Sequence, residues 1–164
     1  PYILNVTYSS VDVSCNNGTD GQIILNPIGG IQPYNFIWSN GSNTQNQINV
    51  SAGNYSVDIY DDNGCNIPQI NFILSQPPAS NLNEIITDVN CHGNSDGAID
   101  ITYFPSSAVN QFTYNWNGPN SYSSNNEDIS SIIAGLYTLT IIENGICNKV
   151  VSYVVNEPDS LKII

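Results

Sequence analysis

Apolar and polar residues alternate in many short segments of the chain, and the aromatic residues follow the same alternation. A period of two places every second side chain on one face of a β-strand. The residues that share a face in this way are Ile23 and Leu25; Tyr34, Phe36 and Trp38; Tyr55, Val57 and Ile59; Ile99 and Ile101; Phe112, Tyr114 and Trp116; and Tyr137, Leu139 and Ile141. The pattern predicts an all-β chain of short strands.

Turn-forming dipeptides separate these segments. Asn-Gly begins at residues 17, 40, 63, 117 and 144, and Asp-Gly begins at residues 20 and 96. Both favour tight turns, because Asn, Asp and Gly tolerate a left-handed backbone. About six or seven short strands in each half of the chain, with turns between them, are typical of an antiparallel β-sandwich.

The order of these features occurs twice. Residues 12–23 read DVSCNNGTDGQI and residues 88–99 read DVNCHGNSDGAI, with six of twelve positions identical. The spacing between equivalent residues grows from 76 here to 82 at the later Ala-Gly-x-Tyr segments, which begin at Ala52 and Ala134. Insertions of this kind are typical of surface loops, so the pattern indicates a duplicated domain.

Pro-containing segments close both copies, at Gln76-Pro77 and at Glu157-Pro158. The sequence therefore predicts two tandem immunoglobulin-like β-sandwich repeats, at residues 1–77 and 78–158, and the start of a following repeat at residues 159–164. We therefore expect this chain to be a segment of a longer array of such repeats.

Each copy contains two cysteines with a tryptophan between them. This order resembles the immunoglobulin core, in which a tryptophan packs against a disulfide. The aromatic residues expected in the two cores are Trp38, Tyr55, Trp116 and Tyr137.

Four cysteines allow three pairings, and the repeat favours one bridge within each copy, Cys15–Cys65 and Cys91–Cys147. Such a bridge contributes about 4 kcal/mol in the chain-entropy model. A zinc site is the competing interpretation, but there is no Cys-x-x-Cys pair and His92 is the single histidine.

Charge excludes several classes of partner. The chain has 14 acidic residues against Lys149 and Lys162, for a net charge of −12. Nucleic acids and anionic membrane surfaces both require more cations than this. No apolar run approaches the roughly 20 residues that a membrane-spanning helix needs, so no membrane insertion is expected. Four cysteines in an acidic, lysine-poor chain favour an extracellular location.

Few residues offer site chemistry. A single histidine and the lack of a nucleophile motif predict that the protein is not an enzyme and has no catalytic residues. Four acids in turns could bind calcium weakly: Asp20, Asp61, Asp62 and Asp96. The alternative is that they only form tight turns, and the lack of a twelve-residue ligand loop favours it. No other cofactor is expected.

Three tyrosines could stack on sugars if they face outward, and the favoured alternative is packing at an edge strand or between repeats. They are Tyr60, Tyr103 and Tyr122.

The segments VSCNNGTDGQI, GGIQPYNFIWSNG, SAGNYSVDIYDDNGC and SQP resemble the SprB repeat, and the second copy resembles a divergent member. This family occurs in large surface adhesins of gliding bacteria that use type IX secretion. The resemblance implies tandem immunoglobulin-like modules, a bacterial cell-surface location and roles in adhesion and gliding, without catalytic residues. Asp159-Ser160-Leu161 also resembles an O-glycosylation signal of these bacteria, with Ser160 as acceptor.

Together these observations predict a non-enzymatic, extracellular repeat segment of a surface adhesin that acts as a semi-rigid stalk, with short Pro-containing linkers. The expected partners are neighbouring repeats of the chain, and surface glycans or other subunits. Two alternatives are a subunit of an extracellular filament and a carbohydrate-binding accessory module of a secreted enzyme.

Overall fold

The structure, a computed structural model, describes residues 2–105 and 111–161. The chain divides into two compact units, Pro1–Pro77 (unit 1) and Pro78–Ile164 (unit 2). The boundary lies at the position that the repeat indicates. Of the expected following repeat, residues 162–164 lie outside the described part of the chain.

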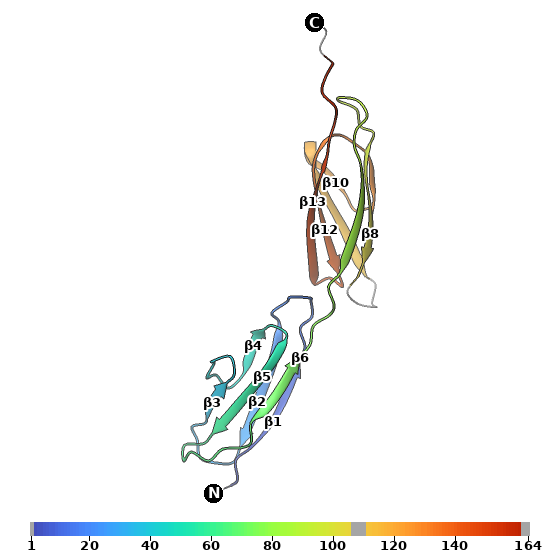
Figure 1. The fold of residues 1–164 in the computed structure, drawn as a ribbon. Coiled ribbons are helices and arrows are strands. Elements are labelled where there is room, and N and C mark those ends of the chain that lie inside the picture. Colours follow the sequence, from blue (N-terminus) through green and yellow to red (C-terminus); the bar gives the residue numbers. More distant parts are fainter. Residues whose placement is uncertain (1, 106–110, 162–164) are drawn as a thin grey trace. The chain divides into compact units, whose positions relative to one another are not determined.

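Unit 1 is a sandwich of two three-stranded antiparallel sheets (Figure 1). One sheet has the order β1-β2-β4 and the other has the order β3-β5-β6. The strands are β1 (Asn5–Val11), β2 (Gly21–Ile28), β3 (Asn35–Trp38), β4 (Gln47–Val50), β5 (Gly53–Tyr60) and β6 (Ile70–Leu74).

Unit 2 repeats this plan with one additional strand. Its sheets have the orders β11-β8-β7 and β10-β9-β12-β13. The elements are β7 (Asn81–Thr87), β8 (Gly97–Phe104), β9 (Phe112–Gly118), the 3-10 turn η1 (Pro119–Ser121), β10 (Tyr122–Ser124), β11 (Ile129–Ile132), β12 (Gly135–Glu143) and β13 (Cys147–Val155). Both units are all-β, immunoglobulin-like sandwiches, which confirms the predicted fold class.

A tryptophan lies at the centre of each core. Trp38 and Trp116 are 2% and 1% exposed, and their rings lie 5.9 Å from those of Phe72 and Tyr153, respectively. Trp38 Nε1 donates to the Thr44 carbonyl at 2.8 Å, and Trp116 Nε1 donates to the Asn126 carbonyl at 3.1 Å. Each indole therefore fills the core without leaving its N–H unpaired.

The two Ala-Gly-x-Tyr segments begin β5 and β12. Tyr137 is buried, whereas Tyr55 is only partly buried and packs against the core of unit 1. The Tyr55 hydroxyl donates to the Ser51 carbonyl at 2.9 Å, and the Tyr137 hydroxyl donates to the Ile133 carbonyl at 3.0 Å. The motif therefore ties the start of each strand to the preceding loop.

Candidate functional site

The chain enters unit 1 at one end of the sandwich, which we call the entry pole, and leaves it at the opposite end, which we call the exit pole. At the entry pole, Gly30 N donates to the Tyr2 carbonyl at 2.8 Å, which places the loop after β2 beside the incoming chain. At the exit pole, Asn17 N donates to Gln76 Oε1 at 3.0 Å, which places the β1–β2 loop beside the outgoing chain. The chain thus crosses the unit along its strands.

The cysteines of unit 1 lie at opposite poles. Cys65 is held at the entry pole, where its N–H donates to Asp61 Oδ1 at 2.8 Å and Asp62 N donates to the Ile31 carbonyl. Cys15 is in the β1–β2 loop at the exit pole. The eight residues of β5 run between the two poles, a span of about 23 Å. A disulfide requires Cα atoms within about 7 Å, so these cysteines cannot pair.

Unit 2 has the same arrangement. Cys147 pairs in register with Glu143 at one end of the β12–β13 hairpin, and Lys149 Nζ donates to the Ser80 carbonyl beside the incoming chain at 2.9 Å. At the other end, Gly93 N, two residues after Cys91, donates to Glu157 Oε2 at 2.7 Å. Cys147 is therefore the entry-pole cysteine and Cys91 the exit-pole cysteine.

The predicted disulfides within each copy are wrong. Cys65 and Cys91 are free and exposed, whereas Cys15 and Cys147 are disulfide-bonded. The prediction rested on the repeat, which places two cysteines in each copy. Here the cysteines of one unit lie in loops and turns at opposite ends of the sheets.

Asp61, one of the predicted calcium ligands, is buried and closes the entry-pole turn. Its Oδ1 accepts from the N–H groups of Asn63 and Cys65 at 3.0 and 2.8 Å, and its Oδ2 accepts from Ile31 N at 3.1 Å. Burial raises the pKa of this carboxyl group, but the three backbone hydrogen bonds outweigh burial and hold the pKa below its ordinary value. The adjacent Asp62 is exposed.

Asp20 and Asp96 occupy equivalent turns at the exit poles. Asp20 Oδ1 accepts from Ser14 N at 3.0 Å, and Asp96 accepts from Asn90 N and Nδ2 at 3.2 and 2.7 Å. Side-chain hydrogen bonds, followed by backbone ones, from these partners lower the pKa of both carboxyl groups. Within residues 2–105 and 111–161, no three acidic, His or Cys side chains are grouped so that they could hold a metal. The hydrogen bonds of Asp20, Asp61 and Asp96 to nearby N–H groups are those expected of aspartates that stabilise tight turns.

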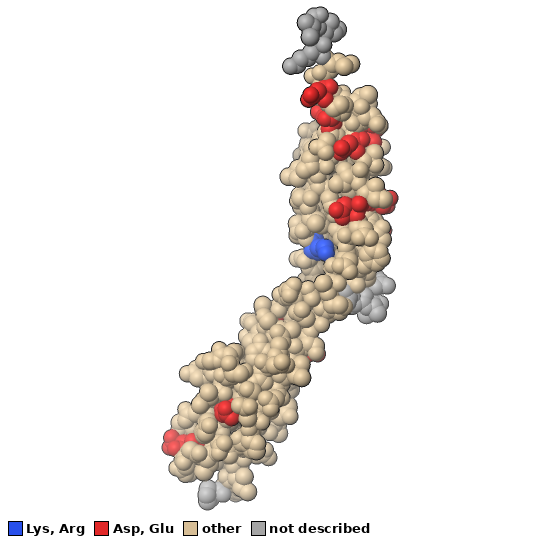
Figure 2. Space-filling model, viewed as in Figure 1, with Lys and Arg blue, Asp and Glu red and all other residues tan. Residues whose placement is uncertain are grey.

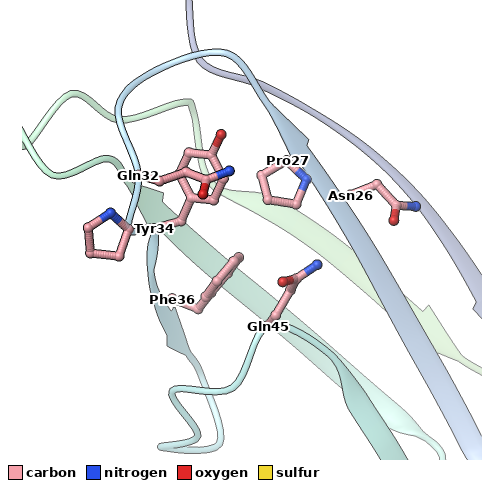
Figure 3. Close-up of a pocket in the computed structure, with 7 residues that line it drawn as sticks. Asn26, Pro27, Gln32, Tyr34, Phe36 and Gln45 are labelled. Carbon is pink, nitrogen blue, oxygen red and sulfur yellow. The ribbon is translucent and has the colours of Figure 1, made fainter.

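A lateral hollow opens between the two sheets of unit 1 (Figure 3). Its volume is about 380 Å³, and it is lined by Asn26, Pro27, Gln32, Pro33, Tyr34, Phe36 and Gln45. Figure 3 shows Phe36 between Tyr34 and Gln45, facing the strand that carries Asn26 and Pro27.

The hollow exists because β4 pairs only with residues 21–23 of β2. Beyond that point, side chains replace the missing strand: Asn46 Oδ1 accepts from Leu25 N at 2.9 Å, and Gln45 Nε2 donates to the Leu25 carbonyl. Pro27 follows and has no N–H to offer, so this side of β2 stays open. The sequence analysis missed this site.

In unit 2 an aromatic ring occupies the position of Pro27. Tyr103 is 8% exposed, its ring lies 5.6 Å from that of Phe112, and its hydroxyl donates to the buried Glu143 at 3.0 Å. Burial raises the pKa of the Tyr103 hydroxyl. Tyr103 therefore packs inside unit 2 and does not face outward. Tyr60 and Tyr122 are partly buried, and the Tyr122 ring packs on Tyr137 at 5.5 Å.

The visible surface is sparsely charged. Figure 2 shows acidic side chains as separate spots, and one basic side chain, on a face that is otherwise uncharged. Lys149 is the one cationic Lys or Arg side chain among the described residues, so they form no basic patch. The described residues also contain no helix that is long and apolar enough to cross a membrane. Ser160 is exposed, and its O-glycosylation stays a prediction.

Several solved structures are similar to the chain at low identity. A structure of titin domains I67–I69 (E-to-A variant) has a TM-score of 0.39 and 9% identity, over 96% of this chain and 66% of that one. Fibronectin(III)-like modules of Clostridium thermocellum CbhA have a TM-score of 0.33 and 10% identity, over 94% and 95%. The BSP domain of a biofilm associated protein has a TM-score of 0.30 and 12% identity, over 97% and 30%.

A comparison with curated protein sequences finds no match. The model of the SprB repeat family matches two segments, residues 7–43 in unit 1 and residues 83–121 in unit 2. The matches begin at equivalent strands, β1 and β7, of the two sandwiches. Each of the two units therefore carries one match to the SprB repeat family.

Proposed function

We propose that the chain is a non-enzymatic, extracellular repeat segment of a bacterial cell-surface adhesin, in which it acts as a load-bearing, semi-rigid spacer in adhesion and gliding. The match to the SprB repeat family in both units supports an extracellular module of adhesin type. The observation that carries the mechanical role is that the chain enters each unit at one pole and leaves at the other.

Tension along the chain would load each sandwich in shear. In unit 1 the first and last strands, β1 and β6, both run from the entry pole to the exit pole and contact each other. Val13 N donates to the Ser75 carbonyl at 3.0 Å, and Ser75 N donates to Asp12 Oδ1 at 2.8 Å. Pulling on the two ends of the unit displaces these strands past each other, so the bonds must break together.

Unit 2 has equivalent hydrogen bonds between the segments that follow its first and last strands. Val89 N donates to the Asn156 carbonyl at 2.9 Å, and Asn156 N donates to Asp88 Oδ1 at 2.8 Å. An aspartate before the equivalent valine accepts the bond in both copies, although the partner changes from Ser75 to Asn156. A bond retained in both units supports a shared role in holding the terminal strands.

Single-molecule stretching of the whole chain tests this role under reducing conditions, because the disulfide bonding of Cys15 and Cys147 would otherwise shield the chain between them from tension. We expect two separate unfolding events, with Asp12→Ala weakening one and Asp88→Ala the other. Loss of one such bond, about 1 kcal/mol, accelerates forced unfolding of its unit about fivefold if the bond breaks before the transition state. The matched controls are Asp62→Ala and Asp100→Ala, which remove exposed acids elsewhere in units 1 and 2. Unfolding without resolved force peaks, or equal effects in variants and controls, would contradict the proposal.

The lateral hollow favours a second function, binding of a carbohydrate by unit 1. Aromatic rings and amide side chains together suit sugars, because rings stack on the apolar sugar face and amides bond to hydroxyl groups. Tyr34 and Phe36 supply the rings, and Asn26 and Gln32 supply exposed amides.

A glycan array tests this function with a pair of substitutions at one position. Pro27→Tyr introduces the residue that unit 2 carries and should fill the hollow, whereas Pro27→Ala leaves it open. We expect Pro27→Ala to retain glycan binding and Pro27→Tyr to weaken it at least about tenfold. If no glycan binds, or if both variants bind alike, the hollow is not a carbohydrate site.

A further inference from the structure

We propose that Cys65 and Cys91 are attachment sites for a further copy of this repeat, in which the entry-pole cysteine of one copy forms a disulfide with the exit-pole cysteine of another. The proposal goes beyond the spacer function, because it makes the joint between copies covalent.

The four cysteines fall into two equivalent pairs. Cys15 and Cys91 occupy the same place in the DVSC and DVNC segments and lie at exit poles. Cys65 and Cys147 follow the equivalent Asn-Gly turns and lie at entry poles. One member of each pair is disulfide-bonded, Cys15 and Cys147, and the other member is free and exposed. Each position has therefore formed a disulfide in one copy of the fold.

The surroundings of Cys91 can accommodate another chain. Cys91 lines an exit-pole hollow of about 420 Å³, together with Asn90, His92 and residues 158–161. The imidazole of His92 lies 3.1 Å from the Glu157 carboxylate, which holds one wall of the hollow in place. Leu161 at the rim is fully exposed. The hollow is of a size that can receive a protruding turn.

The surroundings of Cys65 supply such a turn. A Cβ added to Gly64 would meet no atom within 4 Å, so the turn that carries Cys65 projects into open space. Tyr2 and Ile3 at the same pole are 89% and 91% exposed.

The bond forms by two thiol–disulfide exchanges with a small disulfide such as oxidised glutathione. The Cys65 thiolate attacks the oxidant and releases one glutathione thiolate, leaving a mixed disulfide. The Cys91 thiolate of another copy then attacks the Cys65 sulfur and releases the second glutathione. The two protons from Cys65 and Cys91 pass to the released thiolates, and the oxidant gains two electrons.

Head-to-tail attachment makes a prediction that random oxidation does not. In a heterologous contact, each pole binds only the opposite pole. The whole chain carrying Cys65→Ser retains only an exit-pole thiol, and the chain carrying Cys91→Ser retains only an entry-pole thiol. Each variant alone should stay monomeric in oxidised glutathione, whereas an equimolar mixture at the same total concentration should form dimers.

Non-reducing electrophoresis and peptide mapping measure the result. We expect at least tenfold more dimer in the mixture than in either variant, with Cys65 joined to Cys91, and none in the variant that lacks both cysteines. Three outcomes would overturn the proposal: equal dimer yields in the single variants and the mixture, closure of Cys65 and Cys91 within one chain, and glutathione adducts without dimers. The spacer function is unaffected by each of them, because the stretching experiment tests it separately.

Discussion

At the scale of single residues, two buried tyrosines of unit 2 differ in hydrogen bonding. The Tyr137 hydroxyl donates to the Ile133 carbonyl, whereas Tyr153 Oη is buried without a partner among the described residues. A buried polar group without a partner costs about 1–3 kcal/mol. Unit 1 carries Phe72 at the position of Tyr153, and Phe72 packs on Trp38 as Tyr153 packs on Trp116. The hydroxyl of Tyr153 is therefore the unfavourable feature.

We predict that removing these hydroxyl groups has opposite effects. Tyr153→Phe should raise the free energy of unfolding of unit 2 by about 1 kcal/mol, because it removes an unpaired group. Tyr137→Phe should lower it by about 1 kcal/mol, because the Ile133 carbonyl loses its donor. Urea unfolding followed by Trp116 fluorescence, with Trp38→Phe as background, measures both. Equal losses in the two variants would show that Tyr153 has a solvent partner.

At the scale of elements, the strands whose buried and exposed residues alternate could be predicted, and the mostly exposed strands β1 and β7 could not. The residues with period-two alternation lie on β2, β3, β5, β8, β9 and β12, and most of their apolar positions are buried as expected. β1 and β7 are edge strands whose residues are mostly exposed. A strand with little buried surface needs no alternation, so its sequence carries a weak signal.

The turn between β5 and β6 illustrates what a sequence pattern leaves open. Asp61-Asp62-Asn63-Gly64 predicts a tight turn but not which aspartate is buried. The structure buries Asp61, whose carboxylate joins this turn to Ile31 in the β2–β3 loop. The equivalent position in unit 2 holds the buried Glu143. Only the contact with Ile31 in the β2–β3 loop identifies Asp61 as the buried aspartate.

Asp61 should make unit 1 sensitive to acid. Hydrogen bonds hold its folded-state pKa below the ordinary value of 3.8, so its contribution is complete above that value and is lost as pH falls through the folded pKa. We predict that Asp61→Asn destabilises unit 1 at pH 7 and makes its stability depend less on pH below about 4. Urea midpoints from Trp38 fluorescence, with Trp116→Phe as background, measure this.

The matched control for this prediction is Asp62→Asn. It removes the same charge from the adjacent, exposed residue without removing the acceptor of the three backbone N–H groups. An identical pH dependence in Asp61→Asn and the unaltered chain would contradict the assigned role of the buried carboxylate.

At the scale of the whole molecule, two separate cores explain the duplicated sequence. The buried residues form one cluster around Trp38 and another around Trp116. Each cluster draws on both sheets of its own unit, so each copy of the repeat contains what its own core requires. Insertions between equivalent residues therefore leave the two-sheet plan unchanged, although the segment between β9 and β11 adds η1 and the edge strand β10 to unit 2.

The cysteines show how a correct comparison can give a wrong pairing. Their order around a tryptophan resembles that of an immunoglobulin domain, and the sandwich is confirmed. However, Cys15 follows β1 in a loop, and Cys65 lies in the turn after β5. Their position beside Asn-Gly turns, outside the alternating segments, is the signal that could have placed them at the poles. A disulfide depends on distance in the fold and not on order along the chain.

By itself the sequence determined the fold class, the duplication, the two tryptophan-centred cores and the scarcity of basic residues. These properties follow from local periodicity and composition, which each segment carries independently of its neighbours. Only the tertiary structure decided which cysteines are free, which aspartate is buried and where β2 stays open beside Pro27. Those properties depend on contacts between residues distant in the chain, because burial and pairing arise only when the sheets pack together.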